Sequence, residues 1–127
     1  MNNLLLVGIG GFLGSIARYL LGGLILHHTA QERFPCSTFA VNVLGCMVIG
    51  VLAGLADRQG LFGPGTRLFL FTGVLGGFTT FSAFGLEAML LVRRGELLVA
   101  SLYACASVIV GITAVWLGLR LVALFGR

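Results

Sequence analysis

The sequence describes a short and strongly apolar chain. It has 127 residues, of which 58% are hydrophobic and only 9% are charged, whereas a soluble domain carries about 25% charged residues. So few charged side chains cannot cover a water-facing surface, and the soluble protein classes are therefore excluded. All eight basic residues are arginines, and they are scattered rather than gathered into a basic stripe, which argues against a nucleic-acid partner.

Four long apolar stretches are separated by charged residues and by clusters of proline and glycine. They are Leu4–Leu26, Phe39–Ala56, Leu68–Val92 and Leu97–Leu119. Each is close to the roughly 20 residues that a helix needs to cross a bilayer core of about 30 Å. We therefore expect an all-α membrane protein with a single domain over residues 1–127, in which four transmembrane helices with short loops lie in a lipid bilayer.

The arginines near the ends of these stretches favour neither orientation in the membrane. One side would carry Arg58, Arg67, Arg120 and Arg127, and the other would carry Arg33, Arg93, Arg94 and, inside the first span, Arg18. Because loop Lys and Arg residues set orientation, two possibilities stay open: a weak bias decides, or the chain inserts both ways and pairs antiparallel. Four helices are few to enclose a polar path, so we expect an assembly of at least two chains.

Small residues spaced four apart mark faces for close helix contact. They are Gly10 and Gly14, Cys46 with Gly50 and Gly54, Gly73 and Gly77, and Ser107 with Gly111. Glycine lets helix backbones approach closely in a membrane, where no hydrophobic effect drives helices together. The pattern indicates tight packing and says little about function.

Polar side chains within the spans are few, and each is a candidate functional position because burial in lipid is costly. Arg18 lies in the first span, Asn42 in the second and Glu87 in the third. Thr38 and Asn42 share a helix face that begins just after Pro35, a residue suited to a helix start. Two interpretations of Asn42 remain open: a hydrogen bond between helices, and an amide donor offered to an anion.

The third span contains a run of glycines and threonines near its middle. Gly73, Gly76 and Gly77 are followed by Thr79 and Thr80. Glycine costs a helix about 1 kcal/mol relative to alanine, and threonine competes for backbone hydrogen bonds. We expect the helix to break at these glycines, with a kinked helix as the alternative. The second half would start with a hydroxyl cap from one of the threonines, and freed carbonyls could hold a cation.

Aromatic and hydroxyl side chains follow the expected break. Phe81, Phe84 and Glu87 are spaced three apart and lie near one helix face, while Tyr103 and Ser107 are four apart in the fourth span. Phenylalanines in a membrane helix usually pack or face lipid. Their positive ring edges, beside amide and hydroxyl donors, could instead line a path for a small anion. The sequence offers no nucleophile–base pair and no metal-ligand cluster, so we do not expect an enzyme.

Three strings occur in a fixed order along the chain: GGFLGSIARY at 10–19, PCSTFAVN at 35–42 and GGFTTFSAF at 76–84, with Glu87 downstream. Together they resemble the Fluc (CrcB) family of bacterial fluoride channels. The similarity runs the length of the chain with the same four-span layout. The third string with its downstream Glu87 is the specific one, and the first string alone would not be.

The resemblance implies a passive, fluoride-selective channel in the bacterial cytoplasmic (inner) membrane, which exports fluoride and thereby gives fluoride resistance. It implies an antiparallel, dual-topology homodimer with two pores and the third helix broken near its centre. It also implies a structural sodium ion at the dimer centre, held by the backbone carbonyls of Gly76 and Thr79. It places Arg18 toward the vestibule and Glu87 on a polar track. The residues that it assigns to the fluoride pathway are Thr38, Asn42, Thr80, Phe81, Ser82, Phe84, Tyr103 and Ser107.

The chain departs from the family pattern at two places. Ala83 stands where the family usually has a hydroxyl, which predicts one missing polar contact. Ser37, beside Cys36, stands where the family usually has glycine, which alters the packing at the start of the second helix.

Two other functions fit a compact four-span chain. A proton-coupled small multidrug transporter relies on an acidic residue in the first span, where this chain has only Arg18. A membrane assembly subunit without transport would use its glycines only for packing and Asn42 only to join helices.

Overall fold

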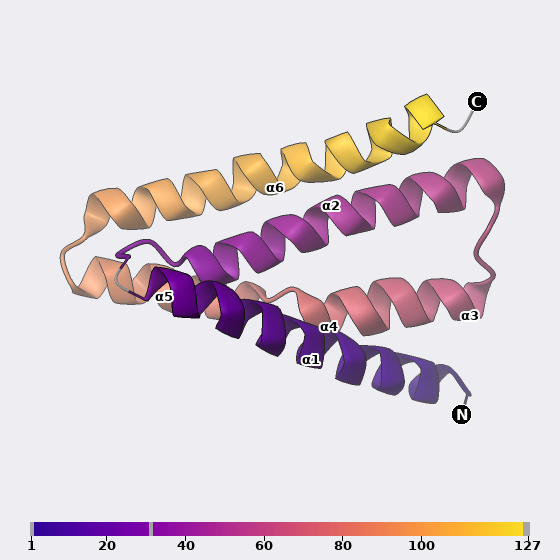
Figure 1. The fold of residues 1–127 in the computed structure, drawn as a ribbon, viewed down its shortest axis with the longest axis horizontal. Helices are drawn as coiled ribbons and strands as arrows, with labels where there is room; N and C mark the ends of the chain where they lie inside the picture. Colours follow the sequence, from indigo (N-terminus) through magenta and orange to yellow (C-terminus); the bar gives the residue numbers. More distant parts are fainter. Residues whose placement is uncertain (1, 31, 126–127) are drawn as a thin grey trace.

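The part of the chain that the computed structural model describes, residues 2–30 and 32–125, contains helices and no strands (Figure 1). Arg127, one of the arginines counted above, and the side chain of Arg58 lie outside the described part. The elements are α1 (Asn2–Thr29), α2 (Cys36–Gln59), α3 (Pro64–Arg67), the π-helix η1 (Leu68–Leu75), α4 (Gly76–Phe78), α5 (Phe81–Arg93) and α6 (Leu97–Phe125).

Four segments of the described chain are long and apolar enough to cross a membrane. They are Asn2–Thr29, Cys36–Asp57, Pro64–Arg93 and Leu97–Phe125. The third combines α3, η1, α4 and α5, and Figure 1 shows the two chain ends at the same end of the bundle, as an even number of crossings requires. The prediction of an all-α protein with four spans and a broken third helix is therefore confirmed.

The helices extend beyond the apolar stretches that predicted them. The first continues to Thr29 rather than ending at Leu26, and the last continues to Phe125 rather than ending at Leu119. Hydropathy marks the part of a helix that matches the hydrocarbon core, whereas backbone hydrogen bonding continues through polar residues into the interface.

Close backbone contact joins α1 to the first half of the third span. A Cβ atom added to Gly10 would lie 2.7 Å from the carbonyl oxygen of Phe69 and 2.9 Å from Cα of Gly73, and one added to Gly77 would lie 2.5 Å from the carbonyl oxygen of Gly11. Only residues without a side chain fit at these contacts. The predicted packing role of the small residues is confirmed here.

The third span is interrupted at Thr79 and Thr80, where the backbone is extended with ψ values of 156° and 114°. Gly73 lies within η1, and Gly76 and Gly77 lie within α4, so the expectation that these glycines form the break is wrong. Close contact with α1 holds the segment containing Gly73 and Gly77 in helical form. The chain leaves the helix at the two β-branched threonines that follow, because such residues suit extended backbone.

One cluster of buried side chains lies near the turn between α5 and α6. Leu91, Ala100 and Tyr103 form this cluster, and Phe34 and Phe84 pack against it. The outer faces of the four spans expose many large apolar side chains, which suit contact with lipid or with another chain.

Candidate functional site

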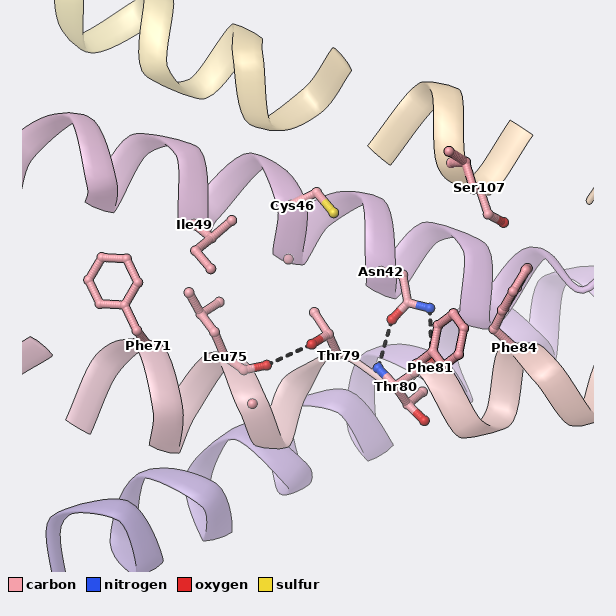
Figure 2. A pocket seen from close by; sticks show the side chains of 13 residues that line it. Asn42, Cys46, Ile49, Phe71, Leu75, Thr79, Thr80, Phe81, Phe84 and Ser107 are labelled. Carbon is pink, nitrogen blue, oxygen red and sulfur yellow. Dashed lines mark hydrogen bonds between the residues drawn. The ribbon is translucent and has the colours of Figure 1, made fainter. Parts of the chain in front are cut away.

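A groove of about 380 Å³ lies beside the break, between α2, the third span and α6 (Figure 2). It brings together seven of the residues that the sequence singled out: Asn42, Gly76, Thr79, Thr80, Phe81, Phe84 and Ser107. The rest of its lining is mostly apolar and includes Cys46, Ile49 and Leu75. The break therefore opens onto a cavity that carries a few polar groups in apolar walls.

Asn42 of α2 binds the backbone of the break in two directions. Its Nδ2 donates to the carbonyl oxygen of Thr80 at 3.0 Å, and its Oδ1 accepts from the Thr80 N–H at 2.8 Å (Figure 2). Where a helix is interrupted, backbone groups lose their intrahelical partners, and Asn42 replaces them for this residue. The interhelical interpretation is thus correct. The pair uses one of the two Nδ2 hydrogens, and donation of the other to an anion stays a prediction.

The second half-helix begins with a threonine cap. Thr80 Oγ1 accepts from the N–H of Ala83 at 3.3 Å and lies 3.4 Å from Ser82 Oγ, while Thr79 Oγ1 donates to the carbonyl oxygen of Leu75 at 2.9 Å. Of the two candidate caps, Thr80 therefore starts α5 and Thr79 closes the preceding turn. Ala83 joins the cap through its backbone, which needs no side-chain hydroxyl.

The two phenylalanines after the break lie beside each other, as their spacing predicts. The ring centroids of Phe81 and Phe84 are 5.5 Å apart, and Phe84 lies 5.1 Å from the ring of Tyr103. Phe81 is 83% exposed on the isolated chain, whereas Tyr103 is fully buried. The aromatic row thus runs from an open surface into the core.

Glu87 of α5 links this helix to α2 and α6. Thr38 of α2 donates to Glu87 Oε1 at 2.6 Å, and the Tyr103 hydroxyl of α6 donates to Glu87 Oε2 at 2.7 Å. Each carboxyl oxygen therefore has its own donor, which lowers the cost of placing the group within a span. The structure brings together three predicted residues whose mutual contact the sequence did not indicate.

Ser107 carries an unpaired polar atom at the groove. Its Oγ is buried, and within the described part of the chain it has no hydrogen-bond partner. An unsatisfied buried hydroxyl costs about 1–3 kcal/mol. The Ser107 hydroxyl is therefore a donor in the groove wall that the described residues leave unused.

Arg18 lies on the other side of the break. Its Nε donates to the carbonyl oxygen of Gly77 at 3.0 Å, and Ser15 Oγ lies 3.5 Å from the same oxygen. Both residues line a second cavity of about 380 Å³ between α1, α2 and α5, which Thr80 and Ala83 also border. The family resemblance implied a position of Arg18 toward the vestibule, which stays a prediction. Its bond to the break was not foreseen, and neither was the role of Ser15, although a spacing of three puts the two on one helix face.

The first loop supplies another residue that the sequence analysis missed. Phe34 packs edge-on against Phe39, with centroids 5.3 Å apart, and against Tyr103 at 5.2 Å. An apolar residue just before the helix cap often packs on the fourth helical residue. Phe34 before Pro35 and the fourth helical residue Phe39 fit that arrangement, so this signal was present in the sequence.

The departure at Ser37 adds a contact between the first two helices. Ser37 Oγ donates to the carbonyl oxygen of Gly22 at 2.8 Å. The hydroxyl that stands in place of glycine therefore ties the start of α2 to α1 beside the second cavity.

Four apolar spans and, at a helix break, a groove with a few polar groups in apolar walls define a multi-pass membrane protein. The family model described as CrcB-like protein, Camphor Resistance (CrcB), matches residues 5–119, and the chain belongs to this family.

Several curated relatives share the name fluoride-specific ion channel FluC. The protein from Methylobacillus flagellatus is 51% identical over 96% of this chain and 95% of its own length. Those from Chlorobium chlorochromatii and Flavobacterium psychrophilum are 49% and 40% identical over 92% and 94% of this chain, covering 89% and 95% of their own lengths. With its four spans, the protein is a multi-pass protein of the bacterial inner membrane.

Proposed function

We propose that the protein is a passive, fluoride-selective ion channel that exports fluoride across the cytoplasmic membrane. The observation that carries the proposal is the groove at the break, where the amide of Asn42 and the unpaired hydroxyl of Ser107 stand beside the rings of Phe81 and Phe84. The names of relatives up to 51% identical, which are ion channels and not enzymes, support it.

The chemistry of this groove suits a small, strongly hydrated anion. A pore for fluoride has to replace lost water with several donors, and it must avoid a fixed cation that would trap the ion. The groove lining offers an amide, hydroxyls and ring edges, and none of the described residues that line it is basic. The guanidinium of Arg18 is engaged on the other side of the break.

A second copy of the chain would complete the pathway. On one chain Phe81 is 83% exposed and the groove is open to the outside. An antiparallel partner would cover both and would create two equivalent pores. The balanced loop arginines support dual topology, because neither orientation is favoured.

The residues at the break fit a structural sodium ion between two such chains. Gly76 and Thr79 both line the groove, and a Cβ atom on Gly76 would meet nothing closer than 3.9 Å, so its backbone is accessible. The last carbonyls of a helix lack intrahelical partners, and hard oxygen ligands suit such a cation. Two carbonyls per chain would form half of a site that an antiparallel dimer completes.

The proposal is tested with the purified protein in liposomes loaded with fluoride or with chloride. We expect fast fluoride efflux and little chloride efflux. Absence of fluoride flux, or equal chloride flux, would contradict the channel. A protein that transports neither ion would then fit an assembly subunit. Drug uptake driven by a proton gradient would instead identify a multidrug transporter.

The aromatic residues of the pathway are tested by shortening each ring. Phe81→Ile and Phe84→Ile should each lower fluoride efflux by about tenfold or more, since a lost transition-state contact of about 1.4 kcal/mol is a tenfold change in rate. Phe125→Ile, at the exposed end of α6, is the matched control. Unchanged flux in both pathway variants, with the dimer intact on size exclusion, would show that the rings only pack.

A further inference from the structure

Arg18 binds the end of the first half of the third span. Its Nε–H donates to the carbonyl oxygen of Gly77 at 3.0 Å, with Ser15 Oγ at 3.5 Å from the same oxygen. Gly77 is the second of the three residues of α4, which ends where the span breaks. A carbonyl in the last turn of a helix has no intrahelical partner. The negative end of the helix dipole also favours a cation there.

The contact depends on the close packing of α1 against this segment. A Cβ atom on Gly77 would lie 2.5 Å from the carbonyl oxygen of Gly11, so only glycine brings the two backbones this near. With α1 in contact, the side chain of Arg18 reaches the break from about two turns further along the helix than Gly11. The packing of α1 against α4 therefore also fixes where the Nε–H of Arg18 lies.

The other side of the break is held from α2. Asn42 binds both the N–H and the carbonyl oxygen of Thr80. Arg18 binds Gly77 and Asn42 binds Thr80, so the two side chains hold backbone groups that are separated only by Phe78 and Thr79. The carbonyls of Gly76 and Thr79 adjoin these fixed points.

We propose that Arg18 is a positioning residue, which holds the end of the first half-helix through its Nε–H and does not act through its charge on a passing anion. The flux test of this inference rests on the proposed channel function. A second measurement, which does not involve fluoride, tests it separately.

Two substitutions separate the donor from the charge. In Arg18→Gln the amide nitrogen stands the same number of bonds from Cα as the arginine Nε, so the donor is kept and the charge is lost. In Arg18→Lys a methylene takes that place and the charge is kept one bond further out. A positioning role predicts fluoride efflux within about threefold of wild type for Arg18→Gln. It predicts a fall of about tenfold or more for Arg18→Lys, the equivalent of one lost hydrogen bond.

The second measurement is hydrogen exchange of the segment 78–84 in lipid nanodiscs. Arg18→Lys should speed exchange of these amides at least tenfold, because the half-helix end loses its anchor. Exchange in Arg18→Gln should match wild type. Arg67 is the control, because it donates to the carbonyl oxygen of Ala56 at 3.4 Å, away from the break. Arg67→Gln and Arg67→Lys should leave flux and exchange at 78–84 unchanged.

Fluoride efflux and the protection of the 78–84 amides from exchange should both be higher in Arg18→Gln than in Arg18→Lys. A failure of either comparison overturns the inference. Normal flux in Arg18→Lys with low flux in Arg18→Gln would assign Arg18 an electrostatic role. If the wild type conducts no fluoride, the proposed function fails, and the exchange contrast alone still decides the positioning role.

Discussion

The two halves of the third span are fixed to the rest of the molecule by different means. The first half, η1 and α4, lies against α1 with backbone contacting backbone at Gly10 and Gly73. The second half, α5, is tied to α2 and α6 by side-chain hydrogen bonds, in which Glu87 accepts from Thr38 and Tyr103.

The difference gives the glycines of the first half and the polar residues of the second half separate roles. Close backbone contact tolerates no added volume, whereas hydrogen bonds tolerate shape changes as long as donors and acceptors remain paired. The first half should therefore be sensitive to size and the second half to polarity, with Asn42 at the boundary sensitive to both.

The largest effect is expected at that boundary. Asn42→Ala leaves the N–H and the carbonyl oxygen of Thr80 without their partner, at about 1–3 kcal/mol for each group. Fluoride efflux should fall at least tenfold, and the denaturation midpoint should drop. Asn3→Ala, at an exposed site on α1, is the control. If Asn42→Ala kept wild-type stability, the interruption at Thr79 and Thr80 would not depend on the hydrogen bonds of Asn42.

The next effect tests sensitivity to volume in the first half. Gly10→Ala would place a methyl group 2.7 Å from the carbonyl oxygen of Phe69, and overpacking of this kind costs about 1–3 kcal/mol. Gly8→Ala, where nothing lies within 4 Å of the new methyl group, should be neutral. Equal stability of the two variants, followed by steric-trapping or denaturant unfolding, would contradict the packing.

The smallest effect tests sensitivity to polarity in the second half. Tyr103→Phe keeps the buried ring and removes the donor to Glu87, which should cost about 0.5–1.5 kcal/mol. Thr38→Val removes the donor to the other carboxyl oxygen at a similar cost. The double variant should deviate from additivity because both residues share one partner. Strict additivity would show that the two hydrogen bonds act independently.

The sequence predicts the number of spans, the break and its cap because these features depend on local composition. Thr80 caps α5 through a residue three positions away, which a local pattern can indicate. The glycines were misassigned because a glycine run signals either a flexible break or a close contact. The difference lies in Gly10 and Gly11 of α1, more than 60 residues away in the chain.

For most of the candidate site, the sequence likewise predicts which residues take part and does not predict which of them contact one another. Seven predicted residues line one groove, yet the pairing of Asn42 with Thr80 and of Arg18 with Gly77 required the helices to be placed in space. Spacing along a helix identifies a shared face, but it does not say which helix that face meets.

Thr80 borders both the groove and the cavity beside Arg18. The interruption of the helix gives Thr80 an extended backbone, so a single residue forms part of two walls. A change in the size of this side chain would therefore alter both spaces together.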